Sequence, residues 1–142
     1  MTTPKLSPAL PASAAHGPCE ARRRQVMGDA FVDRALAGAT ALTRPLQAHV
    51  NDHAWGSTWL RGGLTLKERS LCTVAMLAAL GHTEELKGHL RGAMNNGATL
   101  EELREVLLHV IPYAGVPPSG AAFRAMGEWM KLEGLSFNTP SE

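Results

Sequence analysis

Apolar residues recur at helical spacing along nearly all of the chain from Glu20 onward. The first apolar positions are spaced for one or two short helices that break near Gly28 and Gly38. These positions are Val26, Phe31, Leu36 and Leu42. A second segment has Pro45 in its first turn, where proline is tolerated, and ends near Gly56.

The next helix has a clear start and a clear stop. Thr65 and Glu68 have the spacing of a capping box, and Gly81 marks the end. Between them the residues are apolar almost all round the helix, which predicts a central core helix. Cys72 lies within this run and is expected to be a buried small apolar residue.

Two further helices are predicted over 83–96 and 99–111, joined by a short turn at Gly97, so they should form a central αα-hairpin. Thr83 is expected to cap the first, and Thr99 opens a second capping box.

Prolines and glycines determine where the last predicted helices end and begin. Pro112 should loosen the end of the 99–111 helix, and Gly115-Val-Pro-Pro should break the chain. Ser119 is then expected to cap a last helix that stops at Gly134. No segment shows sustained strand alternation with hairpin turns, so the predicted class is all-α, with about six or seven helices.

The length of 142 residues predicts one domain, here 19–136. Residues 1–18 are rich in Pro, Ala and Ser and are expected to be a disordered or loosely docked tail, with a short C-terminal tail at 137–142.

Charge and cysteine content narrow the possible partners. Lys plus Arg is 14 and Asp plus Glu is 13, giving a formal net charge of +1, so no global field favours nucleic acid or a membrane surface. No apolar run reaches the roughly 20 residues that span a bilayer. The two cysteines, Cys19 and Cys72, are far apart in the sequence, which indicates a reducing cytoplasm.

Glu85 and His89 form the strongest candidate for chemistry. Residues four apart lie on one face of a helix, where a carboxylate can orient an imidazole and favour its charged form. Such a pair could donate a proton near neutral pH. The alternative is a surface Glu–His pair worth a few tenths of a kcal/mol.

The spacing of the histidines around Glu85 does not favour a metal site. His82, Glu85 and His89 share a helical face, but His82 and His89 are separated by about 10.5 Å along an ideal helix. One ion cannot easily bridge that span. His49 and His53 have a spacing that can bind zinc, although no third ligand is evident.

A series of short motifs follows one another between residues 31 and 130. These are Val32-Asp33-Arg34-Ala35-Leu36, Trp55-Gly56-x-x-Trp59, Gly63-Leu64 with Arg69-Ser70, Glu85-Leu86-x-x-His89-x-Arg91-x-Ala93, Asn95-Asn96-Gly97 and Tyr113-x-Gly115-Val116-Pro117. In these motifs and in their order the chain resembles the carboxymuconolactone decarboxylase family.

The resemblance implies an all-helical subunit that assembles into a ring-like homo-oligomer, a trimer or hexamer. The fold is shared with thiol-dependent alkylhydroperoxidases, which carry Cys-x-x-Cys just before the histidine corresponding to His89. Here those two positions hold His82 and Glu85, so a redox-active dithiol is absent.

The implied activity is cofactor-free decarboxylation of 4-carboxymuconolactone to β-ketoadipate enol-lactone in aromatic catabolism. The electron pair left by CO2 can delocalise into the lactone carbonyl, so no pyridoxal, thiamine or metal is needed. The expected partner is a small anionic lactone.

The resemblance also implies roles for individual residues. His89 would donate the proton, with Glu85 as its partner, and Arg61 and Arg69 would bind the substrate carboxylates. For the two arginines, ion pairs at a helix end or a subunit interface are an equal alternative. Trp55, Trp59 and Tyr113 could form the walls of a dry pocket, although aromatic residues at such spacing are more often part of a core.

The chain departs from the family pattern at Glu84, where His is usual, and at Ala114, where Cys is usual. Pro112 also replaces an aliphatic residue. Two alternatives therefore stay open. One is a related lyase, isomerase or hydrolase-type enzyme for another anionic lactone, and the other is an inactive ring protein that binds small molecules.

Overall fold

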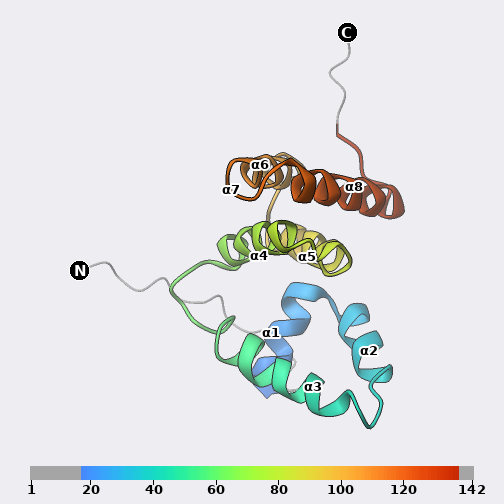
Figure 1. Cartoon of the computed structure of the whole chain (residues 1–142). Helices are drawn as coiled ribbons and strands as arrows, with labels where there is room; N and C mark the ends of the chain where they lie inside the picture. The colour runs from blue at the N-terminus through green and yellow to red at the C-terminus, as the bar shows by residue number, and fades with distance from the viewer. Residues whose placement is uncertain (1–16, 138–142) are drawn as a thin grey trace, which may run out of the picture. The chain divides into compact units, whose positions relative to one another are not determined.

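The computed structural model describes residues 17–137, and its regular structure is entirely helical over that range (Figure 1). The elements are α1 (Gly17–Met27), α2 (Asp29–Ala37), α3 (Arg44–His49), the π-helix η2 (Val50–Gly56), α4 (Leu66–Leu80), α5 (Thr83–Asn95), α6 (Leu100–His109), α7 (Ile111–Ala114) and α8 (Val116–Glu133). The all-α prediction is confirmed. Within this range no helix combines the length and hydropathy that crossing a membrane requires. Nearly all of the two predicted tails lies outside the described residues.

The chain divides into two compact units, an N-terminal unit up to Arg69 and a C-terminal unit from Ser70 onward. Each unit has its own buried apolar cluster. In the N-terminal unit the cluster consists of Val26, Met27, Val32, Trp55, Trp59 and Leu66.

A buried arginine, Arg23, links three helices of the N-terminal unit. Arg23 of α1 donates to the side-chain oxygens of Gln47 and Asn51, at 2.9 and 3.1 Å. Both partners follow about 25 residues later in the chain, so these bonds tie α1 to α3 and η2. Because Arg23 is 6% exposed, hydrogen bonding is what makes its burial tolerable.

The approach of η2 to α1 requires a glycine. A Cβ atom at Gly56 would lie 2.8 Å from the sulfur of Cys19, closer than two such atoms can come. The π-helical turn is also visible in its hydrogen bonds, since the amides of Ser57 and Trp59 bond to carbonyls five residues earlier, those of Asp52 and Ala54.

The C-terminal unit is built around the contact of α5 with α8, the most extensive one in this unit. Figure 1 shows α6, α7 and α8 on one side of this unit, with α4 and α5 on the other. The buried side chains come from α4, α5, α6 and α8, and they include Val74, Leu86, Leu90, Leu103, Leu107, Ala122, Met126 and Trp129. These helices therefore share one core.

Most of the predicted helix boundaries are confirmed. Both capping boxes form, with the hydroxyls of Thr65 and Thr99 each accepting a bond from the amide of the glutamate three residues later at 3.1 Å. Gly97 has φ +91°, a conformation in which glycine is favoured, and it lies in the short turn that joins α5 to α6. Pro112 does interrupt the predicted 99–111 helix, which is split into α6 and α7.

Two predicted caps are wrong. Helix α8 begins at Val116, with Pro117 and Pro118 in its first turn, where their missing N–H groups cost nothing. Ser119 therefore lies inside the helix and is 1% exposed, and its hydroxyl donates to the carbonyl of Leu107 at 2.8 Å. Thr83 is the first residue of α5, and the capping position before it, His82, makes no side-chain cap bond.

The prediction that α4 is a central core helix with a buried Cys72 is also wrong. Only one face of α4 contributes to the core, through Val74 and Ala78. On another face Cys72 is exposed, and Met76 is 57% exposed. An apolar sequence all round a helix therefore does not mean that one subunit covers all of it.

We expect Ser119→Ala to destabilise the protein by about 1–3 kcal/mol, because it leaves the buried Leu107 carbonyl without its partner. Urea unfolding followed by circular dichroism would measure the change. The matched control is Ser136→Ala at an exposed serine, which should change stability by less than about 0.5 kcal/mol. Equal stability of the two variants would contradict the importance of this bond.

Candidate active site

Glu85 and His89 lie one turn apart on α5, in the C-terminal unit. Glu85 is exposed, and His89 is half-buried beside the fully buried Leu90. The carboxylate raises the pKa of His89, as expected for a nearby negative charge, but the burial of the imidazole lowers it by more. The net pKa of His89 is thus below its ordinary value of 6.5, although Glu85 raises it in the direction that the spacing predicts.

A lowered pKa changes what His89 can do. Above about pH 6.5 the ring is mainly neutral, with one nitrogen donating and the other accepting. When it does carry a proton, its low pKa makes it a stronger acid than an ordinary histidine. The arrangement therefore still suits proton transfer to carbon, with a charged form that becomes more populated as the pH falls.

Arg61 and Arg69 lie in the N-terminal unit and are in contact. Nη2 of Arg69 donates to the backbone carbonyl of Arg61 at 3.0 Å. The structure adds a third arginine that the sequence analysis did not select. Arg22 is 1% exposed, and its pKa is lowered first by burial and then by the positive charge of Arg69. The guanidinium groups of Arg22 and Arg69 thus lie near enough for the charge of one to affect the other.

Trp55 and Trp59 are neighbours in the core of the N-terminal unit. They are 5% and 7% exposed, and their ring centroids are 5.0 Å apart. In this unit both rings are covered by protein, as the core interpretation expects.

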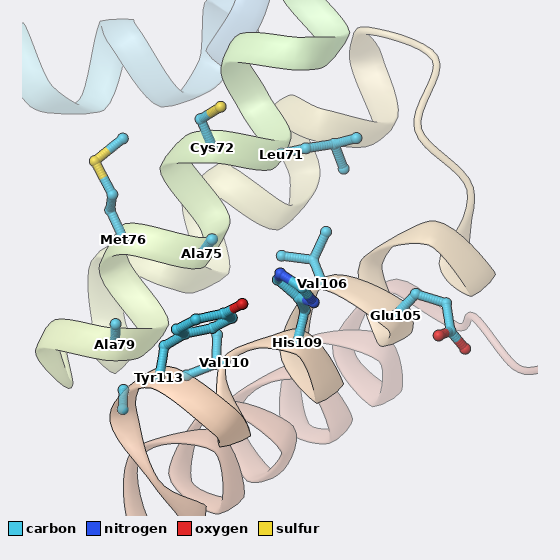
Figure 2. A pocket seen from close by; sticks show the side chains of 11 residues that line it. Leu71, Cys72, Ala75, Met76, Ala79, Glu105, Val106, His109, Val110 and Tyr113 are labelled. Atoms are coloured by element: carbon cyan, nitrogen blue, oxygen red, sulfur yellow. The ribbon is translucent and has the colours of Figure 1, made fainter.

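Tyr113 lies in the C-terminal unit and has a very different environment. It is 81% exposed and lines a groove of about 630 Å³ between α4 on one side and α6 and α7 on the other (Figure 2). The walls are mostly apolar, formed by Leu71, Ala75, Met76, Ala79, Val106 and Val110 among others.

The same groove contains a second Glu–His pair, Glu105 and His109, which the sequence analysis missed. Its i, i+4 spacing equals that of Glu85 and His89. The ring of His109 lies 5.3 Å from that of Tyr113, which is four residues further along. The signal was present in the sequence as Glu, His and Tyr at steps of four, but Pro112 suggested that the helical face did not continue to Tyr113.

No cluster of three or more metal-ligating side chains occurs among residues 17–137. The rings of His49 and His53 have centroids 4.0 Å apart, in the N-terminal unit. His82 lies just before α5 and is exposed.

Comparison with known proteins gives the family. A model of the carboxymuconolactone decarboxylase family matches residues 44–128, more than half of the chain. A protein of Acinetobacter baylyi named 4-carboxymuconolactone decarboxylase is 41% identical over 114 residues, covering 80% of this chain and 85% of its own. Nitrosuccinic acid decarboxylase of Metarhizium robertsii is 44% identical over 95 residues, 67% of this chain and 66% of its own. The chain belongs to the carboxymuconolactone decarboxylase family.

The lowered pKa of His89 predicts the direction in which stability changes with pH. Below about pH 6.5 the unfolded chain takes up a proton at this residue that the folded chain resists, so folding becomes less favourable as the pH falls. Replacing His89 by Gln removes this contribution. The loss of stability between about pH 7.5 and about pH 5.5, measured by urea unfolding, should be smaller in His89→Gln than in the wild type.

The control for this measurement is His82→Gln, which alters an exposed histidine in the same unit. It should keep the wild-type pH dependence. The burial argument would be contradicted by a His89→Gln protein that loses as much stability on acidification as the wild type does.

Proposed function

We propose that this protein catalyses the decarboxylation of 4-carboxymuconolactone to β-ketoadipate enol-lactone without a cofactor. The observation that carries the proposal is the 41% identity to a relative of that name over 80% of this chain. Both relatives are named decarboxylases, so the chain is a carboxy-lyase by kinship to each of them.

The chemistry needs few groups. The bond between the γ-carbon and its carboxylate breaks, CO2 leaves, and the electron pair stays on carbon and delocalises through the C=C bond to the lactone carbonyl oxygen. A proton is then delivered to carbon. The protein has to hold a dianionic substrate, stabilise the developing oxyanion and supply that proton.

We assign the proton to His89, with Glu85 as the charge that partly offsets the effect of burial. The half-buried position supports this role, because a ring shielded from water transfers its proton to substrate and not to bulk solvent. We also propose that Arg61 and Arg69 bind the carboxylates of the substrate. The nearby positive charge of Arg22 supports them, since two close guanidinium groups favour an anion. Trp55 and Trp59 would then act by supporting that region of the N-terminal unit.

Nitrosuccinate is a second candidate substrate, favoured by the 44% identical relative that is named for it. It is also a dicarboxylate, and one of its carboxylates is attached to the carbon that bears the nitro group. Loss of that CO2 places the electron pair on the nitro oxygens, so the demands on the protein are the same. A chain that departs from the family pattern at Glu84 and Ala114 could serve either substrate.

We also propose that the protein acts in the cytoplasm as a homo-oligomer, a trimer or hexamer. Cys19 and Cys72 are free thiols, which suits a reducing compartment. Apolar side chains on α4, α7 and α8 are exposed in the subunit, among them Leu80, Ile111 and Val116 at 68%, 37% and 65%. A single subunit leaves this surface in water, and association would cover it.

Multi-angle light scattering should therefore give a particle of at least three subunits at micromolar concentration. Leu80→Glu places a charge on the exposed apolar surface and should shift the particle toward smaller species. Glu101→Gln, at an exposed residue of α6, is the control and should leave the mass unchanged. A wild-type protein that is strictly monomeric would contradict this proposal.

Purified protein should consume 4-carboxymuconolactone, generated in situ, with release of one CO2 per lactone. Removal of a positioned general acid should slow turnover, so His89→Ala should lower kcat by about 10²- to 10⁴-fold. The exposed His82→Gln variant is the control and should keep wild-type activity.

Lactone loss followed by absorbance, together with CO2 release, measures both steps, and nitrosuccinate should be assayed in parallel. Faster turnover of nitrosuccinate would favour the second candidate. A His89→Ala protein with intact helical content and full activity would contradict the role assigned to His89.

A further inference from the structure

The groove between α4 and α6–α7 has the size and lining of a small-molecule site. Its volume of about 630 Å³ lies within the roughly 300–1,000 Å³ typical of ligand pockets. All of its lining residues belong to the C-terminal unit, so one subunit forms it. The groove is much larger than a butenolide ring needs, which leaves room for the substituents as well.

The polar groups of the groove converge from one wall. His109 and Tyr113 come from α6 and α7, and Figure 2 shows the hydroxyl end of Tyr113 pointing toward the His109 ring. Within residues 17–137 neither the phenol hydroxyl nor the imidazole has a hydrogen bond to another side chain. Glu105 lies one turn before His109, and Figure 2 shows its carboxylate on the far side of Val106 from Tyr113.

The apolar walls determine what these two donors can do. Opposite them, α4 presents Ala75 and Met76, with the thioether of Met76 and the thiol of Cys72 as only weak hydrogen-bonding groups. With a ligand in place, water would be displaced from this side. Hydrogen bonds from His109 and Tyr113 would then act in a medium of low dielectric constant, where they are stronger than in water.

We propose that this groove holds the lactone ring of the substrate, and that His109 and Tyr113 donate hydrogen bonds to the carbonyl oxygen that becomes negative as CO2 leaves. This proposal rests on the proposed activity and assigns two further catalytic residues to it. His89, Arg61 and Arg69 do not line the groove, so the proposal gives them no part in holding the lactone ring. The electron pair of the breaking C–C bond ends on that oxygen and is stabilised there by the two donors, until carbon is protonated.

No arginine or lysine lines the groove. The substrate carboxylates would therefore point toward its open side, where solvent or another positive group can reach them. The ring, which is the electron sink, would occupy the apolar part. This orientation places the reacting carboxylate at the boundary between water and the apolar interior.

The chain contains one tyrosine, Tyr113, and this permits a direct test. Protein labelled with 13C at the ζ carbon of tyrosine gives one such signal, which reports hydrogen bonding of this hydroxyl. The probe is 5-oxo-2,5-dihydrofuran-2-acetate, a butenolide that lacks the departing carboxylate and so is not consumed. We expect the signal to shift in a saturable way with the probe, and Ala75→Trp, which fills the groove, to weaken probe binding at least tenfold.

Kinetics give the second readout. Tyr113→Phe and His109→Gln should each lower kcat by about 10²- to 10³-fold with a smaller change in KM, as expected on removing a donor to an oxyanion. Glu105→Gln should have a smaller effect than His109→Gln, because the Glu105 carboxylate lies on the far side of Val106 from Tyr113. The control for the groove-filling variant is Ala41→Trp, at an exposed position of the N-terminal unit, which should leave kcat and KM unchanged.

The outcomes separate this inference from the proposed function. An active wild type whose Tyr113→Phe and His109→Gln variants keep full kcat would overturn the inference and leave the function intact. A tyrosine signal that ignores saturating probe but changes with protein concentration would also overturn it, since a second copy would then cover the groove. A wild type without turnover would refute the function, whereas a probe-dependent signal would still support the lactone site.

Discussion

The hydrogen bond from the Ser119 hydroxyl to the Leu107 carbonyl is the interaction on which the arrangement of the C-terminal unit depends. The last carbonyls of a helix have no partner within it, and that of Leu107 belongs to a fully buried residue near the end of α6. The side chain of α8 satisfies that carbonyl from inside the core. Without it, α6 could end in this position only at the cost of an unpaired polar group, and the residues that follow would lose their support.

The consequences of this bond extend to the groove. His109 is two residues beyond Leu107, and Tyr113 follows four residues later. Both project from a helical end that is fixed by α8 and flanked by the turn at Pro112. An exposed aromatic residue near a chain break would ordinarily be poorly positioned. Here the chain before it is anchored at Leu107, which is buried and bonded to Ser119.

Local signals in the sequence predicted most of the helix boundaries. The wrong predictions concern residues whose environment depends on parts of the chain that are distant in the sequence. Capping boxes and glycines act within a few residues, so Thr65, Thr99 and Gly97 were read correctly. The role of Ser119 depends on a carbonyl twelve residues away, which no local pattern encodes. The exposure of Cys72 likewise depends on what covers α4, and the sequence of α4 cannot contain that information.

The pKa of His89 could likewise be predicted only in part from the local sequence. Two Glu–His pairs with identical spacing, on α5 and α6, have different surroundings. Spacing predicted the sign of the effect of Glu85 on His89 correctly, but burial is the larger influence and follows from tertiary packing. The family motif selected one pair, and only the groove drew attention to the other.

The π-helical turn of η2 restricts the deletions that this chain can tolerate during evolution. A π-turn uses more residues than an α-turn, and deletion of one residue between Val50 and Gly56 would let the helix revert to α geometry. The residues beyond it would then rotate by about 100°, which would turn Trp59 out of the core. The length of this stretch is therefore more tightly constrained than the identity of its exposed residues, Asp52, His53 and Ala54.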